Sequence, residues 1–473
     1  MTERRRIDRK RAGRKYPATL FASAKSISGR IKEERRKMKT KTKIVALLEI
    51  GVVLSGVLFL AAPVFAAEQN AEASQAAATA AAGSGDGYVL GIYGNANEDD
   101  TIDMRDFTYT ARIICWLEEK NELADANNDG EIDVGDMTQI GLIILGKESE
   151  LTIVDSADRI VTVKMPVERL IPTDYRATEA ELAIGARDLI VGVDRAFHER
   201  MAEFGLEDLP EVSEHSKFVD YEAVLVLEPD LVVLPTWQAG SADDVAEHLP
   251  GIPVIVMGCT KKETIVPDLK TMGMLLGKRD EAGALIEWTQ KYDGIVEERT
   301  EDLEPEEMPT FYYEYMSGSK KWWAITPEDS SAGQVAEGCG GRNIAAGQPG
   351  SKVEVQAEWV IKQNPDVMFC DLMKGFESGP GKTEEEMQEL LEEILADRPG
   401  FEAVEAVKKN KVYLIDRDLI SGPRWVIGHC YFAKWLHPEL FSDIHPEEMH
   451  DEYLSEFHDL ELEGTWAYPL PQE

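Results

Sequence analysis

Two segments rich in Asp and Asn carry oxygen donors at the alternating spacing that suits a calcium ion. The first set is Asn95, Asn97, Asp99, Thr101, Asp103 and Asp106, and the second is Asp125, Asn127, Asp129, Glu131, Asp133 and Asp136. Both sets occupy positions 1, 3, 5, 7, 9 and 12 of a loop, and the second begins thirty residues after the first. Calcium takes about six to eight oxygen ligands, which alternate side chains and one main-chain carbonyl of such a loop supply. The spacing therefore predicts two Ca2+ sites.

Each loop is followed by apolar residues at helical spacing, which predicts a short helix after each site. Gly130 stands where the second loop turns sharply. Asp100 takes that place in the first loop, and we expect this departure to weaken the first site. Residues 88–148 are therefore expected to form a small all-α domain with paired EF-hand-like loops.

Residues 88–147 resemble a type I dockerin, whose paired loops end in Asp rather than in the Glu of an ordinary EF-hand. The resemblance implies a cohesin-domain protein as partner, selected by the two residues before the last ligand of each loop. These are Met104-Arg105 and Val134-Gly135, and their difference argues against symmetric docking. A calcium-stabilised spacer is the alternative that these residues leave open.

A second group of candidates combines aromatic and basic side chains that follow predicted strands. In α/β folds a ligand lies outside the carboxyl ends of the strands. Large planar ligands need aromatic faces, and anionic chelates need Arg as a fixed fork of donors. The ligand-binding candidates are Tyr175, Arg176, His215, Trp237, Tyr313, Tyr315, Trp322, Arg424 and Trp425. Tyr313 and Tyr315 alternate on one strand and share a face, so that one of them could equally belong to the core.

The elements that position these candidates alternate in the order of a parallel α/β fold. From residue 151 onward, short apolar runs typical of strands alternate with helical stretches. Residues 279–303 have apolar side chains at helical spacing and no strand signal, which predicts one long connecting helix. The fold class is therefore α/β, with two Rossmann-like lobes joined by a long α-helix.

The two predicted lobes share a sequence pattern. Glu222 is followed seven residues later by Pro229-Asp230, and Glu358 is followed seven residues later by Pro365-Asp366. A helix ends before each Pro, so each Glu falls near the start of a short helix, where a carboxylate is favourable and stays exposed. Such a matched pair suits a partner with pseudo-two-fold symmetry, such as a dimeric membrane channel with basic side chains.

The region from residue 151 to 460 resembles the class III substrate-binding proteins of ABC transporters, the cobalamin and iron-siderophore type. The shared segments are Arg169-Leu-Ile-Pro-Thr, Leu227-Glu-Pro-Asp-Leu-Val, Gly338-Cys-Gly-Gly-Arg-Asn-Ile, Asn364-Pro-Asp-Val and Lys411-Val-Tyr-Leu-Ile-Asp. The resemblance implies an ABC permease that meets Glu222 and Glu358, and a ligand-contacting Arg at Arg424. It implies an iron chelate or a corrinoid as ligand; haem, with Tyr175 on the iron, is a minor alternative.

Two other classes compete with a receptor: an exported hydrolase with a dockerin, and a cell-surface scaffold protein. The chain has no GxSxG, HExxH or GxxxxGK[ST] motif. A scaffold gains nothing from two matched lobes. We therefore expect a protein that is not an enzyme.

Export is predicted from the start of the chain. Residues 44–67 form an apolar run after Lys39, Lys41 and Lys43, the order of parts in a secretory signal peptide. An uncleaved anchor is the alternative, because the run is long enough to span a bilayer. Translation could begin at Met1 or Met38. The expected domains are a leader and signal peptide (1–67), a flexible linker (68–87), the calcium domain (88–148), an N-lobe (151–277), the connecting helix (278–304) and a C-lobe (305–473).

The charge and the cysteines limit the possible partners. The net charge is −38, which repels nucleic acid, so an anionic ligand must be met by locally placed basic side chains. The five cysteines lack metal-type spacing and are odd in number. We expect buried free thiols rather than a disulfide framework.

Overall fold

The computed structural model describes residues 88–214, 218–260, 262–316, 322–326, 331–373 and 378–469. The predicted leader, signal peptide and linker, together with His215, lie outside these ranges. Within these ranges, no helix combines the length and the apolar character needed to cross a membrane.

The N-lobe contains two small sheets with helices packed around them. In the first sheet, β3, β7 and β8 are parallel and fully buried, as expected for apolar runs covered on both faces. The strands are β3 (Leu170–Pro172), β4 (Val193–Asp194), β5 (Glu211–Glu214), β6 (Phe218–Val219), β7 (Leu231–Leu234) and β8 (Val254–Val256). The helices are α5 (Tyr175–Ala183), α6 (Arg195–Arg200), α7 (Tyr221–Leu227), α8 (Ala242–His248) and α9 (Lys262–Leu275).

The C-lobe is built on one mixed sheet with the strand order β12-β10-β9-β13-β14-β15. Its centre, β9, β13 and β14, is parallel, while β10, β12 and β15 are antiparallel to their neighbours. The strands are β9 (Thr310–Met316), β10 (Trp322–Ile325), β11 (Arg342–Asn343), β12 (Lys352–Val355), β13 (Val367–Leu372), β14 (Val412–Asp416) and β15 (Ala467–Tyr468). The helices are α11 (Ser331–Glu337), α12 (Ala357–Gln363), α13 (Glu384–Ala396), α14 (Glu405–Lys408), α15 (Trp425–Leu436) and α16 (Pro446–His458).

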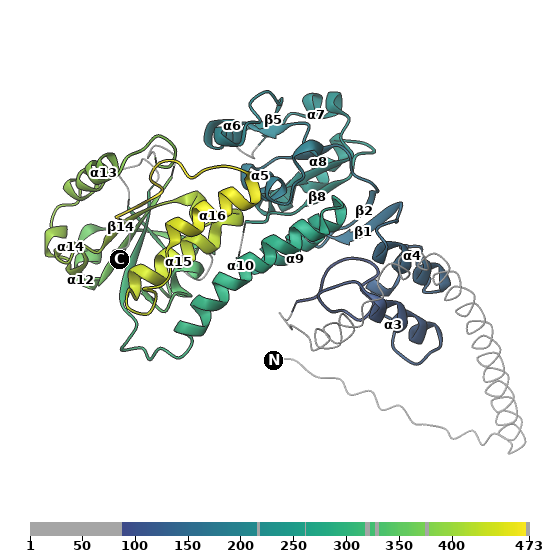
Figure 1. Ribbon diagram of the computed structural model, residues 1–473, viewed down its shortest axis with the longest axis horizontal. Coiled ribbons are helices and arrows are strands. Elements are labelled where there is room, and N and C mark those ends of the chain that lie inside the picture. Colours follow the sequence, from purple (N-terminus) through teal and green to yellow (C-terminus); the bar gives the residue numbers. More distant parts are fainter. Residues whose placement is uncertain are drawn as a thin grey trace, which may run out of the picture.

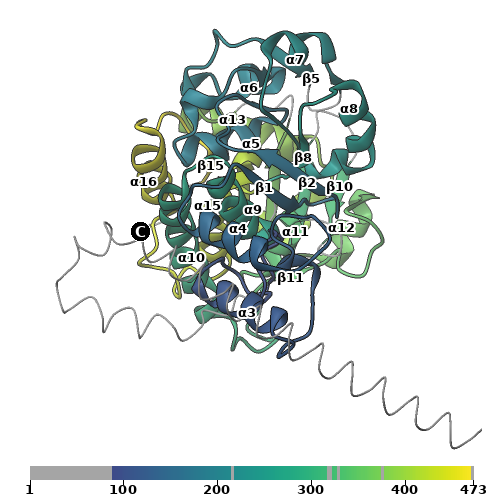
Figure 2. The ribbon, with the colours of Figure 1, turned by 90° about the vertical axis from the view of Figure 1, so that its right-hand side faces the viewer.

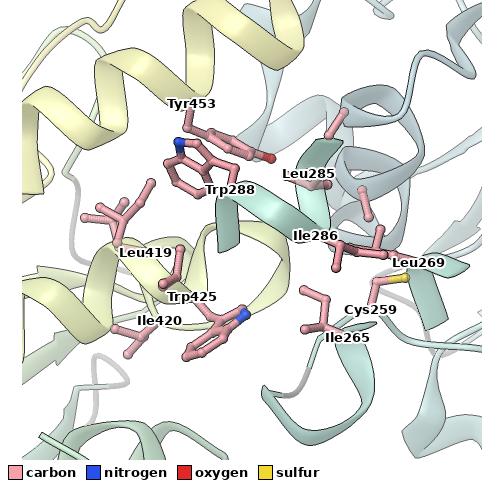
Figure 3. Packing of buried hydrophobic residues seen from close by; sticks show 14 of the residues in the cluster. Cys259, Ile265, Leu269, Leu285, Ile286, Trp288, Leu419, Ile420, Trp425 and Tyr453 are labelled. Carbon is pink, nitrogen blue, oxygen red and sulfur yellow. The ribbon is translucent and has the colours of Figure 1, made fainter. Parts of the chain in front are cut away.

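One long helix, α10 (Arg279–Thr300), runs from the N-lobe to the C-lobe, where the apolar spacing predicts a connecting helix (Figure 1). Leu285, Ile286 and Trp288 of α10 are buried among residues of α9, such as Leu269, and the C-lobe residues Trp425 of α15 and Tyr453 of α16 (Figure 3). One apolar cluster therefore includes residues of both lobes. The lobes share a core along α10 instead of meeting only through a linker.

The predicted calcium-loop domain contains α3 (Met104–Ile114) and α4 (Val134–Ile144), which pack against each other. Helix α4 is the one nearer to the hairpin of β1 (Glu150–Val154) and β2 (Ile160–Lys164) (Figure 2). Ile92 pairs antiparallel with Ile153 of β1. Leu90, Ile92 and Ile143 are buried in the same apolar cluster as the N-lobe. The predicted division between residues 148 and 151 therefore falls inside a continuous core. The five cysteines are buried and free, as expected.

Candidate functional site

The carboxyl ends of strands from the two lobes meet at one place. Helix α5 begins directly after β3, and the side chain of its N-cap residue Asp174 accepts the N–H of Arg176. In the C-lobe, β14 leads into two 3₁₀ turns, Arg417–Leu419 and Gly422–Arg424. Helix α5 packs against the second turn. This is the region in which α/β folds bind ligands.

Arg176 and Trp237 come together at this edge, as the sequence predicts. The Arg176 guanidinium carbon lies 5.2 Å from the centre of the half-exposed Trp237 ring and 4.6 Å from the Tyr175 ring. Gly422 has φ +73°, and a Cβ atom there would lie 3.2 Å from the Arg176 side chain. The turn therefore needs glycine both for its conformation and for the close approach of Arg176.

Tyr315 lies on the C-lobe side of the same region, between two basic side chains. Lys352 Nζ is 4.0 Å from the centre of the Tyr315 ring, and the Arg417 guanidinium carbon is 5.3 Å from it. Burial and the charge of Arg417 lower the pKa of Lys352. The pKa of Arg417 is raised despite its burial, mainly by Asp371, and the like charge of Arg176 in the other lobe opposes this shift.

Arg417 is held by an ion pair with the buried Asp371 of β13. Burial raises the pKa of Asp371 to about 7, and Arg417 opposes this shift. Sequence reasoning missed Lys352, Asp371 and Arg417. Arg417 directly follows the last residue of β14, Asp416, and this place after a strand end could have marked it as a candidate. Lys352 begins β12, an antiparallel edge strand, and no local sequence pattern indicates where that strand lies in the sheet.

Tyr175 is buried and bridges the lobes. Its hydroxyl donates to Asp418 Oδ1 at 2.9 Å, and Arg200 donates to Asp418 Oδ2 at 2.7 Å. Burial alone would raise the pKa of Asp418, but Arg200 and Arg424 hold it below its usual value. The Tyr175 hydroxyl is therefore committed to an anion of the opposite lobe.

Arg424 and Trp425, the residues expected to be the main ligand contacts, are instead buried between the lobes. Arg424 is 0% exposed, and its Nε lies 2.7 Å from Glu179 Oε1 of α5, while the Tyr453 hydroxyl donates to the same oxygen at 3.0 Å. Trp425 is 2% exposed within the core (Figure 3). The preceding turn directs both side chains inward, so they hold the lobes together and do not line an accessible surface.

Two further candidates take other positions. Tyr313 is fully buried beside Phe369 and Phe432, with its hydroxyl 3.5 Å from Asp371, and is therefore a core residue. Trp322 lies in β10, opposite Val355 of β12.

The matched carboxylates Glu222 and Glu358 occupy equivalent places in the two lobes. Each lies in the first turn of a seven-residue helix, α7 or α12, and each is exposed. Both helices end in a left-handed residue, Glu228 or Asn364, immediately before the Pro.

The turns that follow these helices are equivalent as well. Asp230 accepts the N–H of Arg169 at 2.9 Å, and Asp366 accepts the N–H of Thr310 at 2.9 Å. The repeat seen in the sequence is thus a repeat of the three-dimensional structure. The α7 surface also exposes Val226, one turn after Glu222, with 82% of its surface accessible.

The predicted calcium loops close in the same way in both copies. Asp106 and Asp136, at position 12, are fully buried, and each accepts main-chain N–H groups of positions 3 and 9 of its own loop. Each also completes a capping box at the start of its helix. Burial raises the pKa of both carboxyls to about 6, although the main-chain hydrogen bonds oppose the shift.

Donor oxygens converge inside each loop. In the first loop, Asn95 Oδ1 and Asn97 Oδ1 both accept the Asp99 N–H, at 3.2 and 3.3 Å. In the second, Asp125 Oδ1 and Asn127 Oδ1 both accept the Asp129 N–H, at 3.1 Å each. Across the described ranges, no group of three or more Asp, Glu, His or Cys side chains is placed so that those groups alone could hold a metal ion. Each of these loops also offers Asn or Thr side-chain oxygens and main-chain oxygens, which a group of Asp, Glu, His and Cys side chains alone does not include. An all-oxygen donor set of this kind fits a hard cation.

Comparison with known proteins identifies the two-lobed region. The sequence profile described as "Periplasmic binding protein" matches residues 170–419, more than half of the chain. The chain belongs to this family. It is 22% identical over 299 residues to the uncharacterized ABC transporter substrate-binding lipoprotein YvrC of Bacillus subtilis, covering 62% of this chain and 87% of YvrC. It is 24% identical over 209 residues to a vitamin B12-binding protein of Vibrio campbellii, and the match covers 43% of this chain and 71% of that protein.

Solved structures agree on the periplasmic binding protein fold. The TroA-like periplasmic binding protein FepB from Veillonella parvula has a TM-score of 0.59 at 22% identity, covering 67% of this chain and 99% of FepB. MolA from Haemophilus influenzae, solved with molybdate, has a TM-score of 0.53 at 18% identity, and the match covers 66% of this chain and 99% of MolA. Periplasmic binding proteins are non-enzymatic components of transport, so the family favours a receptor over an exported hydrolase or a scaffold.

Proposed function

We propose that this protein captures an iron complex such as a ferric siderophore, or a corrinoid, outside the cell and delivers it to an ABC permease. The observation that carries the proposal is the pair of aromatic and cationic groups at the lobe boundary, Arg176 with Trp237 and Tyr315 with Lys352 and Arg417. On a chain with a net charge of −38, these three side chains are the locally placed cations that an anionic ligand would need.

A corrinoid or an iron complex fits this site better than haem does. Aromatic faces bind planar rings, and guanidinium groups bind carboxylate or catecholate oxygens. The vitamin B12-binding protein among the relatives supports the corrinoid choice. For haem, the predicted axial ligand Tyr175 already donates its hydroxyl to Asp418, so the iron would need another partner.

Arg176 tests the ligand site. The Arg176→Ala variant is expected to bind the chelate about tenfold to a hundredfold more weakly, since hydrogen bonds to charged groups contribute about 1.5–3 kcal/mol. Thermal stabilisation of the protein by ferric chelates, cobalamin and haem identifies the ligand, and isothermal titration then compares the variants. Arg112→Ala, an exposed change on α3, is the matched control. Equal affinity of both variants would remove Arg176 from the site.

We propose that Glu222 and Glu358 contact basic side chains of the permease. Charge reversal of both, with Glu222→Lys and Glu358→Lys, is expected to abolish uptake while ligand affinity in solution is unchanged. The control reverses one exposed Glu of another helix in each lobe, Glu247→Lys in α8 and Glu389→Lys in α13. Normal uptake by the first double variant would contradict the docking role.

We also propose that residues 88–148 bind two calcium ions through the loops 95–106 and 125–136. Calorimetry on the whole chain is expected to show two bound ions. The Asp99→Asn variant should lose the ion of the first loop, and the Asp129→Asn variant the ion of the second loop. Docking to a cohesin domain follows from the dockerin resemblance, and a binding assay with a cohesin domain, with and without calcium, tests it. A flat titration would reject calcium binding.

A further inference from the structure

The two calcium loops have different surroundings. In the first loop, position 6 is Asp100, and Lys270 of α9 donates to its Oδ2 at 2.7 Å and to its main-chain oxygen at 3.1 Å. In the second loop, position 6 is Gly130, with φ +91° and open space around it. Asp100 does not have a positive φ. The departure of the first loop from the expected glycine therefore coincides with a contact to the receptor body.

A second connection runs from position 1 of the first loop. The Asn95 side-chain amide donates to the main-chain oxygens of Leu90 and Asp99, at 2.8 and 2.6 Å, and the Leu90 N–H donates to the Asp99 oxygen at 2.9 Å. These bonds attach residues 90–93 to two predicted ligand positions. The geometry of the first loop and the path of this segment therefore depend on each other.

Residues 90–93 in turn extend the β1–β2 hairpin of the body. The Tyr93 N–H donates to the Thr152 oxygen at 2.9 Å, and the Val154 N–H donates to the Gly91 oxygen at 2.7 Å. A Cβ atom at Gly91 would lie 3.1 Å from the Val154 oxygen, so the two chains approach closely. Leu90 and Ile92 are almost completely buried in the core that also contains residues of α9.

The second loop lacks comparable connections. Among the described residues, the hydrogen bonds formed by residues 125–136 all have partners within the calcium-loop domain. The hydrogen bonds between this half of the domain and the body come after the loop: Gln139 donates to the Glu150 main-chain oxygen, and Arg279 donates to the Glu148 carboxylate. In the part of the chain that the structure describes, the first loop thus forms hydrogen bonds to the body with its own residues, and the second loop does not.

We propose that the first calcium loop is an intramolecular brace, whose occupation by calcium stabilises the β1–β2 hairpin and α9 of the receptor N-lobe. The partner of this half of the domain is therefore the chain's own body. The inference rests on the proposed calcium binding. A ligand that binds only the ordered loop stabilises every segment that orders together with it.

Hydrogen exchange of the whole chain, followed by mass spectrometry, tests this brace. Addition of calcium is expected to slow exchange about tenfold in residues 150–164 and 262–275, and to leave β13 in the C-lobe unchanged. Asp99→Asn in the first loop should remove this effect, whereas Asp129→Asn at the equivalent position of the second loop should retain it. Equal effects of the two variants would overturn the asymmetry.

A Lys270 variant distinguishes the proposed brace from calcium binding itself. Lys270→Met is expected to keep two bound calcium ions in calorimetry and to lose the calcium-dependent protection of residues 262–275, while Lys278→Met, just after α9, keeps it. If calcium binds but protects only residues 88–148, the brace is wrong and the calcium proposal stands. If calorimetry shows no calcium uptake, the calcium proposal itself fails.

Discussion

At the scale of single residues, Glu181 on α5 is notable because it is an acid buried in the N-lobe with 2% of its surface exposed. Burial raises the pKa of Glu181 well above its usual value, and the neighbouring Asp174 raises it further. Burial therefore favours the protonated form of this side chain in the folded protein. The unfolded chain releases the proton above a pKa of 4.5.

The sign of the resulting pH dependence follows from proton linkage. A raised carboxyl pKa stabilises the fold fully below about pH 4.5, and this contribution is lost as the pH rises toward the folded-state value, by up to about 1.4 kcal/mol per pH unit. Glu181→Gln should flatten the decline in stability between pH 5 and pH 8. Urea unfolding at pH 5 and at pH 8 measures the change in unfolding free energy, and the exposed Glu287→Gln variant is the control. A Glu181→Gln slope as steep as that of the native protein would contradict this assignment.

At the scale of elements, α15 supports the turns that carry Arg417 and Gly422. A Cβ atom at Gly428 of α15 would lie 2.2 Å from the Leu419 main-chain oxygen and 2.5 Å from the Ile420 side chain. The helix therefore approaches the first turn as closely as its backbone allows. The position of the candidate site thus depends on a helix residue that has no side chain.

Gly428→Ala is expected to destabilise the protein by about 1–3 kcal/mol, because the added methyl group forces the helix away from the turn. Gly283 in α10 is the matched control, since a Cβ atom there meets nothing within 4 Å. Gly283→Ala should be neutral or stabilising by up to about 1 kcal/mol, in accord with helix propensity. Thermal unfolding compares the two, and similar melting temperatures would refute the close-packing argument.

At the scale of the whole molecule, the lobes are joined by charges as well as by the core along α10. Arg424 of the C-lobe and Glu179 of the N-lobe form a fully buried ion pair, and Tyr453 of α16 donates to the same carboxylate. Burial raises the pKa of Glu179 to about 7, against the effect of Arg424. We expect a receptor built in this way to bind its ligand with little movement of the lobes.

Removing one partner of this pair leaves a buried charge without compensation. Glu179→Met alone or Arg424→Met alone is expected to cost about 3–5 kcal/mol of unfolding free energy, while the double variant recovers much of the loss. Chemical unfolding of the three variants forms a double-mutant cycle. Additive losses would show that the two side chains do not act as a pair.

Patterns within short segments were sufficient to predict the helices after the calcium loops, the long helix between the lobes and the equivalent positions of Glu222 and Glu358. These features depend on residues a few positions apart, where helical periodicity and the restrictions of Pro act directly. The α/β class followed from the same local signals, and Arg176 with Trp237 from their places after strand ends.

Other features depended on contacts between distant segments. Arg424 lies 245 residues from Glu179 in the chain, and nothing near Arg424 indicates that its side chain turns inward to a buried carboxylate. The pairing of Arg417 with Asp371, and the contact of the first predicted calcium loop with Lys270, likewise arise only when the chain is folded. A charged side chain has the same local pattern whether it meets a ligand or another lobe, because its partner is chosen by packing in three dimensions.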